Sequence, residues 1–129
     1  MRLLSLPEVL VIAQAVTGIE AETLIRVSRI ELLESAIAAS EAGFGEHDLY
    51  PDFFSKASVL CSRIVRNHPL PDGNKRLGWM ALNVFCDLNG YDLTLGTDEA
   101  VATIQSLAAG NITEEQLSDW IRANTKQRQ

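Results

Sequence analysis

HPLPDGNKR, residues 68–76, decides the fold, because this polar stretch separates two long segments that both carry helical patterns. Its two prolines cannot continue the helix that arrives from the N-terminal side. Asp72-Gly73 is typical of a turn, and Asn74 is a favoured N-cap for the helix that follows. The stretch therefore predicts a helical hairpin with a polar loop at its tip.

The charge at the start of the second helix is unusual. A helix N-terminus carries partial positive charge and favours Asp or Glu, but this helix begins with Lys75 and Arg76. The free backbone N–H groups beside Gly73 already suit an anion, and the two cations extend this preference to a polyphosphate. A locally unfavourable choice of residues is what we expect at a functional site.

The loop offers candidates for the three parts that phosphoryl or nucleotidyl transfer needs: a phosphate clamp, a metal site and a proton acceptor. Asn74, Lys75 and Arg76 would form the clamp together with the helix N-terminus. Asp72 would hold Mg²⁺, and His68, with a reference pKa of about 6.5, would take a proton from an attacking hydroxyl. The residues leave one plain alternative open, a tight helix–helix turn in which Asp72 pairs with Lys75 or Arg76.

Both helices beside the loop are apolar enough to be central. The first is predicted from about Asp52 to Asn67, and the second ends at Asn89-Gly90. The stripes at helical spacing are Phe53, Ala57, Leu60, Cys61 and Ile64 in the first helix and Leu77, Ala81, Val84 and Leu88 in the second. We expect an all-α fold, a compact bundle of about six helices with the active loop between two central helices, in one domain over residues 1–129.

Four further helices are predicted from their N-terminal signals. Capping boxes mark Ser5–Glu8, Ser28–Glu31 and Thr113–Gln116, and Thr97 caps another helix. The remaining segments are predicted as irregular: residues 20–26 as a connection with or without a helical turn, 43–51 as a loop, 91–95 as an extended connector and 126–129 as a frayed tail. His47, in the loop, is either a solvated side chain or part of the wall of a nearby cleft.

Composition excludes several classes of protein. The chain has 129 residues, a formal net charge of −6 and 47% hydrophobic residues, which suits a globular domain and makes direct nucleic-acid binding a poor expectation. Cys61 and Cys86 lie in apolar patterns and are expected to be buried, reduced thiols. The longest early uncharged run, Val9 to Ile19, is too short to span a membrane, and no secretory signal is evident, so we expect a cytoplasmic protein.

Residues 68–76 resemble the motif of the Fic/Doc family, H-P-F-x-[DE]-G-N-[GK]-R, with Leu70 in place of the phenylalanine. The wider chain is similar to the death-on-curing (Doc) branch, through Glu31-Leu-Leu-Glu-Ser-Ala36, Asp48-Leu-Tyr-Pro51 and Leu88-Asn-Gly-Tyr91. The resemblance implies a mostly α-helical protein that uses ATP and Mg²⁺.

The resemblance also assigns roles to single residues. The His68 position is the general base that activates a target hydroxyl, and the Asp72 position is associated with Mg²⁺ and nucleotide phosphates. Gly73 and Asn74 belong to the phosphate-binding anion hole, with Arg76 in phosphate contact. Lys75 is found in Doc, where many Fic proteins have glycine.

Two departures from the family pattern bear on the reaction. Fic nucleotidyltransferases usually carry a second arginine three residues after the first, and Trp79 stands there instead. Doc proteins resemble Fic proteins that bind ATP reversed and phosphorylate a threonine of elongation factor Tu, which halts translation, although Doc has alanine at the Gly73 position. The resemblance therefore favours a protein Ser/Thr kinase of Doc type, with AMP transfer to a protein hydroxyl as the alternative.

A toxin of a type II toxin–antitoxin module is the function that this branch implies. Many Fic proteins are inhibited by a helix with the pattern [ST]-x-x-x-E-[GN], but no glutamate of this chain is followed by Gly or Asn. The Doc branch instead uses a separate antitoxin, so the implied partners are a Phd-like antitoxin and a translation elongation factor as target. A non-catalytic helical interaction module is the alternative from another class.

Overall fold

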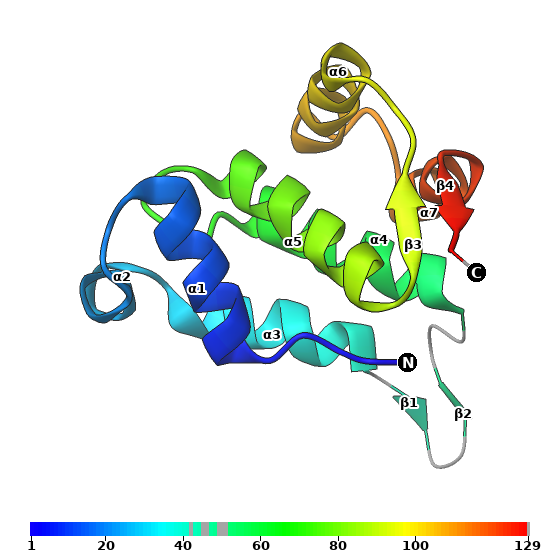
Figure 1. The fold of residues 1–129 in the computed structure, drawn as a ribbon. Helices are drawn as coiled ribbons and strands as arrows, with labels where there is room; N and C mark the ends of the chain where they lie inside the picture. Colours follow the sequence, from blue (N-terminus) through cyan, green and yellow to red (C-terminus); the bar gives the residue numbers. More distant parts are fainter. Residues whose placement is uncertain (42, 45–46, 49–51, 129) are drawn as a thin grey trace.

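The computed structural model describes residues 1–41, 43–44, 47–48 and 52–128, and within them the fold is helical (Figure 1). The helices are α1 Leu6–Thr17, α2 Ala21–Val27, α3 Ile30–Glu41, α4 Phe53–Asn67, α5 Asn74–Leu88, α6 Thr97–Ala108 and α7 Glu114–Ala123. The strands are short: β1 Gly43–Phe44, β2 His47–Asp48, β3 Tyr91–Leu93 and β4 Thr125–Gln127. The predicted all-α class is confirmed.

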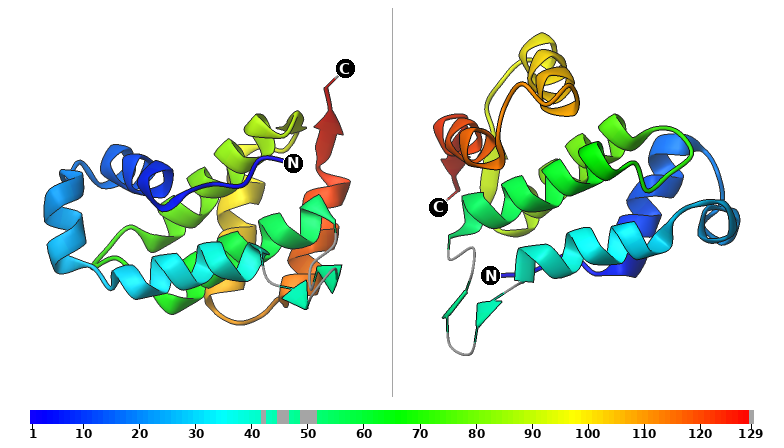
Figure 2. Two further views of the ribbon diagram at one scale, coloured as in Figure 1. Left: turned by 90° about the horizontal axis from the view of Figure 1, so that it is seen from below. Right: turned by 180° about the vertical axis from the view of Figure 1, so that it is seen from behind.

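Helix α4 is the centre of the fold, as its apolar pattern predicts. It packs against α5, α3, α7 and α6, while α1 packs against α5. Figures 1 and 2 show α4 and α5 side by side and antiparallel, with the loop joining them at one end. All five residues of its predicted stripe are buried. The predicted hairpin of two central helices is therefore the scaffold of the site.

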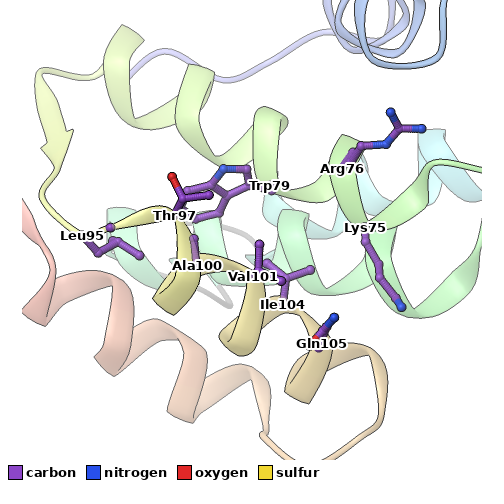
Figure 3. Close-up of a pocket in the computed structure, with 10 residues that line it drawn as sticks. Lys75, Arg76, Trp79, Leu95, Thr97, Ala100, Val101, Ile104 and Gln105 are labelled. Atoms are coloured by element: carbon purple, nitrogen blue, oxygen red, sulfur yellow. The ribbon is translucent and has the colours of Figure 1, made fainter.

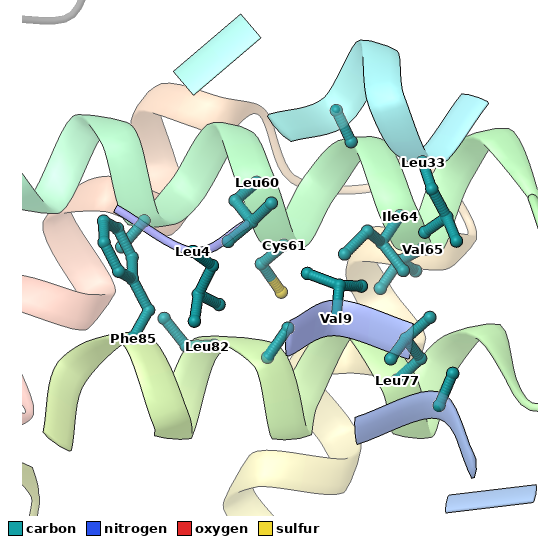
Figure 4. Packing of buried hydrophobic residues seen from close by; sticks show 14 of the residues in the cluster. Leu4, Val9, Leu33, Leu60, Cys61, Ile64, Val65, Leu77, Leu82 and Phe85 are labelled. Atoms are coloured by element: carbon teal, nitrogen blue, oxygen red, sulfur yellow. The ribbon is translucent and has the colours of Figure 1, made fainter. Parts of the chain in front are cut away.

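The core lies mainly between α4, α5, α1 and α3. Figure 4 shows side chains from these helices meeting along the α4–α5 seam. They are joined by Leu4, which precedes α1 in the sequence. Leu60, Ile64, Leu77 and Leu82 are fully buried there. Two predicted members of the α5 stripe lie further out, because Val84 is half-buried and Leu88 is 39% exposed at the C-terminal end of the helix.

Gly78 sets how closely α4 and α5 approach. A Cβ at this position would lie 2.4 Å from Val65 Cγ2 and 3.2 Å from the Cys61 carbonyl oxygen. Val65 is itself fully buried, so it has little room to move. The absence of a side chain at Gly78 is therefore what lets the two central helices pack at this distance.

Gly78→Ala should lower the free energy of unfolding by about 1–3 kcal/mol, because one methyl group would force the helices apart. Gly96→Ala is the matched control, since a Cβ there meets nothing within 4 Å. Urea denaturation of both variants measures the difference. A Gly78→Ala variant as stable as Gly96→Ala would show that α4 and α5 can move apart without lowering the free energy of unfolding.

Both cysteines are buried and free, as the sequence predicts. Burial raises the pKa of each thiol from 9.0 to about 12. The unfolded chain therefore loses thiol protons at lower pH than the folded chain does. Each thiol makes folding less favourable as pH rises above about 9, by up to about 1.4 kcal/mol per pH unit.

We expect the wild type to lose stability between about pH 8 and pH 10 faster than a Cys61→Ala/Cys86→Ala variant does. Urea denaturation at the two pH values measures this, and the difference in unfolding free energy between the two proteins is the quantity to follow. Lysine and tyrosine titrations affect both proteins equally and cancel. A difference that stays constant with pH would contradict the burial of the thiols.

Several boundaries differ from the prediction. Residues 20–26, predicted as a connection, contain most of α2, so the described residues have one helix more than expected. The capping boxes at Ser5–Glu8 and Thr113–Gln116 are confirmed, but α6 has Gly96 at its N-cap and no side-chain cap. The capping box at Ser28 is wrong: α3 begins at Ile30, and the Ser28 hydroxyl has no hydrogen-bond partner among the described residues.

The prediction of a frayed tail over residues 126–129 is also wrong for the first residues of that segment, which belong to β4. β4 pairs antiparallel with β3, which occupies the predicted extended connector, and Arg128 N donates to Gly90 O over 2.7 Å. In the stretch predicted as a loop, β1 pairs with β2. The side chain of His47 lies outside the described part of the chain, so both interpretations of it stay open. No helix among the described residues is long and apolar enough to cross a membrane.

Candidate active site

The loop between α4 and α5 begins with an unusual backbone conformation at His68. This residue caps the C-terminus of α4 with φ 51° and ψ 59°, and it is the one non-glycine residue with positive φ in the described chain. Left-handed conformation at a helix C-terminus is usually taken by glycine. The imidazole is exposed, at the end of a helix whose dipole favours a cation there. The predicted position of His68 is therefore confirmed.

Arg29 holds this end of the loop from the junction between α2 and α3. Its Nη2 donates to His68 O over 2.6 Å and to Asn67 O over 3.3 Å, and its backbone N–H donates to Pro69 O over 2.8 Å. The carbonyls of Asn67 and His68 belong to the C-terminal end of α4, where helix geometry leaves acceptors without partners. Sequence reasoning missed Arg29, because its partner residues lie almost forty positions away.

Asn74 holds the other end of the loop, which corrects its predicted role as an N-cap. Its Oδ1 accepts from Leu70 N over 2.8 Å, and its Nδ2 donates to Leu70 O over 3.0 Å. Asn74 is 7% exposed and Leu70 is 3% exposed, so this pair anchors the loop in the protein interior. Leu70 thereby keeps the buried packing position that the family motif gives to phenylalanine.

Gly73 is the N-cap of α5, with φ 86° and no side-chain hydrogen bond to the helix. The first helical hydrogen bond of α5 is donated by the backbone N–H of Leu77 to Gly73 O over 2.9 Å. The N–H groups before it have no acceptor within the helix. A Cβ at Gly73 would also lie 3.2 Å from Thr17 Cγ2. The N-terminus of α5 is thus uncapped and open to an anion.

The charged side chains around this N-terminus form no ion pairs with the residues that the structure describes. Asp72, Lys75 and Arg76 are exposed, and none of them forms a salt bridge within the part of the chain that the structure describes. The plain alternative, a turn in which Asp72 pairs with Lys75 or Arg76, therefore lacks its expected contact.

One pocket of 380 Å³ brings together all the predicted site residues. It is lined by His68, Pro71, Asp72, Gly73, Asn74, Lys75 and Arg76. A carboxylate, an imidazole, two cations and an uncapped helix N-terminus thus share one solvent-accessible cavity. This arrangement can bind phosphate oxygens and place a proton acceptor beside them.

Two further hollows adjoin the loop. An apolar pocket of 300 Å³ between α5 and α6 is lined by aliphatic side chains of α6 and by Trp79, and it shares Lys75 and Arg76 with the site. Figure 3 shows these two cations leaving α5 in different directions. On the side of Arg29, a hollow of 360 Å³ shares His68 and Asn74 with the site. His68 therefore lines both the pocket of the predicted site residues and the hollow beside Arg29.

A metal ion at this site would depend on more than protein side chains. Within the described residues, no three His, Cys, Asp or Glu side chains gather as a ligand group. Asp72 is the one carboxylate that lines the pocket. This fits Mg²⁺, which commonly binds through one or two carboxylates and completes its coordination with phosphate oxygens and water.

Comparison with known proteins agrees with the geometry of the loop. Residues 3–86 match the Fic/DOC family, and this match contains the whole loop and helices α1 to α4. A curated protein of Mycolicibacterium smegmatis named Toxin Doc is 38% identical over 74 residues. That similarity covers 57% of this chain and 57% of the relative, so it spans little more than half of either protein.

Proposed function

The chain belongs to the Fic/DOC family, and from this premise we propose that it is a Doc-type toxin kinase. It transfers the γ-phosphate of ATP to a Ser or Thr hydroxyl of a translation factor, with elongation factor Tu as the expected target, and so inhibits translation in the cytoplasm. The observation that carries the proposal is the pocket in which His68, Asp72 and two cations without an ion pair among the described residues meet an uncapped helix N-terminus.

The phosphates of ATP bind at the N-terminus of α5 in this proposal. The N–H groups of the first turn and the side chains of Lys75 and Arg76 supply donors and positive charge for them. Asp72 would hold Mg²⁺, which would supply positive charge for the phosphate oxygens. Asn74 contributes by holding the loop closed through Leu70, so its side chain supports the phosphate site rather than contacting phosphate.

His68 removes the proton of the incoming hydroxyl. The hydroxyl oxygen bonds to the γ-phosphorus, the bond from phosphorus to the bridging oxygen breaks, and ADP leaves with that electron pair. The imidazole holds the proton until it is released to water. The hollow between His68 and Arg29 gives the target segment an approach on the side of the imidazole away from the cations.

Trp79 and Lys75 support phosphate transfer over AMP transfer. Trp79 replaces the second clamp arginine and packs instead near Trp120, with ring centroids 6.5 Å apart. The clamp therefore has no guanidinium one turn beyond Arg76, while Lys75 adds a charge at the loop itself. A changed clamp changes which phosphorus faces the nucleophile, because transfer depends on near-attack geometry.

One observation favours AMP transfer as the second candidate. The apolar pocket between α5 and α6 has the aromatic and aliphatic lining that suits a nucleobase, and it borders Lys75 and Arg76. A base bound there would place the α-phosphate, rather than the γ-phosphate, close to the clamp. The two candidates use the same residues and differ in the direction in which ATP lies.

Labelled ATP distinguishes these functions. The antitoxin-free protein is incubated with elongation factor Tu and either γ-labelled or α-labelled ATP, in the presence of magnesium. We expect label on the target from the γ position alone. Label from the α position alone would overturn the kinase proposal and support AMP transfer. No transfer from either position would favour the third candidate, a non-catalytic helical interaction module.

We further propose that the inhibitor is a separate Phd-like antitoxin. The name of the similar relative, Toxin Doc, supports a toxin, and the chain has no glutamate followed by Gly or Asn that could form the internal inhibitory helix of Fic proteins. Expression of this chain alone should arrest growth, and co-expression of a neighbouring small antitoxin gene should relieve the arrest. Arrest that persists equally with His68→Ala would support the interaction module.

A further inference from the structure

The conformation of His68 needs support from outside the loop. A left-handed backbone is less favourable for histidine than for glycine, because Cβ crowds the neighbouring carbonyl. Yet His68 adopts φ 51° at the last position of a helix whose final carbonyls lack intrahelical partners. Some contact must therefore offset the energetic cost of this conformation and supply hydrogen-bond donors to the carbonyls.

Arg29 provides these contacts on the N-terminal side of the loop. Its guanidinium donates to two successive carbonyls, those of Asn67 and His68, and its own N–H donates to the next one, that of Pro69. Three consecutive carbonyls are thereby bound by one residue. A guanidinium at a helix C-terminus also interacts favourably with the negative end of the helix dipole.

These contacts fix the direction of the imidazole, because backbone angles determine where the Cα–Cβ bond points. Asn74 already holds the far end of the loop through Leu70. Arg29 and Asn74 therefore act on opposite ends of the same short segment. Without Arg29, the backbone at His68 would be free to relax toward the extended angles that a residue before proline favours.

We propose that Arg29 is the positioning residue for His68: it holds the left-handed turn at Asn67–Pro69 and so aims the imidazole at the phosphate pocket. This inference rests on the proposed function for its catalytic consequence, but its structural part stands without it. Arg29 does not touch the nucleotide in this proposal, so nucleotide binding is not expected to depend on it.

Arg29→Ala should lower kcat for label transfer from ATP about 10- to 100-fold, because small displacements of a catalytic group are costly. The KM for ATP should change less than about twofold, since the cations and the helix N-terminus remain. Arg29→Lys should recover part of kcat, because an ammonium can donate to one of the carbonyls but not to both in the same geometry.

Arg26→Ala is the matched control on the preceding helix. Arg26 is exposed like Arg29, and its guanidinium donates to Thr23 Oγ1 over 3.4 Å, within α2 itself. This variant removes the same charge close to the loop without removing a loop contact. Equal losses of kcat in Arg26→Ala and Arg29→Ala would overturn the proposal, and so would an unchanged kcat in Arg29→Ala.

NMR separates this inference from the proposed function. The Cα and Cβ shifts of Asn67 and His68 report their backbone angles, and the ring signals of His68 report its surroundings. We expect these signals to move in Arg29→Ala and to stay in place in Arg26→Ala, while urea denaturation confirms that both variants are folded. If the wild type transferred no label, the proposed function would fail and the shifts would still decide the role of Arg29. Unchanged shifts in Arg29→Ala would overturn it.

Discussion

Replacing His68 with alanine should slow phosphate transfer about 10²–10⁴-fold, which is the usual contribution of a positioned general base. The affinity for ATP–magnesium should stay within about twofold, because the cations and the helix N-terminus that bind phosphate in this proposal remain in place. His68 lines the phosphate pocket, but in the described part of the chain it forms no ion pair or hydrogen bond with Lys75 or Arg76 that its loss would disturb. Single-turnover transfer of γ-label measures the first quantity, and calorimetric titration measures the second.

His47→Ala is the matched control, since the chain has two histidines. It should keep transfer close to that of the wild type if His47 is a solvated side chain. The stability of His68→Ala must be measured as well, and we expect it to be near that of the wild type or slightly lower, because alanine is no better suited to a left-handed turn than histidine, while the exposed imidazole makes no buried contact that would be lost. Transfer that survives in His68→Ala and fails in His47→Ala would assign the base to the other histidine.

The site could be predicted from the sequence because its parts lie close together in the chain. Nine residues carry the imidazole, the carboxylate and the cations, and two prolines force the chain to turn between them. Chain connectivity then keeps them close together in space, although Arg29 from outside the loop holds one end of it. The unfavourable charge of Lys75 and Arg76 at a helix N-terminus is likewise a local signal, although the side-chain cap expected there from Asn74 does not form.

What the sequence did not predict depends on contacts between distant segments. Arg29 looks like a solvated charge in its own neighbourhood, and only the approach of the α2–α3 junction to the end of α4 gives it acceptors. The polar C-terminal segment lacks the apolar alternation of a strand, and it becomes one because β3 offers a free edge. Such pairings are not visible in local propensity.

Asn74 shows how two local rules can compete. Asparagine is favoured as an N-cap, and the pattern Asn-Lys-Arg before an apolar stripe supports that position. In the structure both backbone groups of Leu70 need partners in a buried place, and the amide of Asn74 satisfies the two of them at once. Gly73 therefore occupies the N-cap position of α5, where it can adopt φ 86° because it has no Cβ.

The combined variant Lys75→Ala/Arg76→Ala should weaken ATP–magnesium binding about 10- to 100-fold, because each lost cation removes a charge-assisted hydrogen bond to phosphate. We expect the lower part of this range, since both side chains are exposed and solvent screens their charge. Stability should not fall, because two cations at a helix N-terminus oppose the helix dipole and their removal relieves this. Calorimetric titration and urea denaturation measure the two effects.

Arg26→Ala/Lys126→Ala is the control that separates a local clamp from general attraction. Both double variants lower the formal net charge of −6 by two units, but Arg26 and Lys126 lie outside the phosphate pocket. If the clamp binds phosphate directly, the control keeps nearly wild-type affinity, and raising the salt concentration weakens wild-type binding more than that of Lys75→Ala/Arg76→Ala. If both variants lost affinity equally, and with the same salt dependence, the whole charge of this acidic protein would govern binding. The two cations at the start of α5 would then have no special role, and the phosphate site would have to be sought elsewhere.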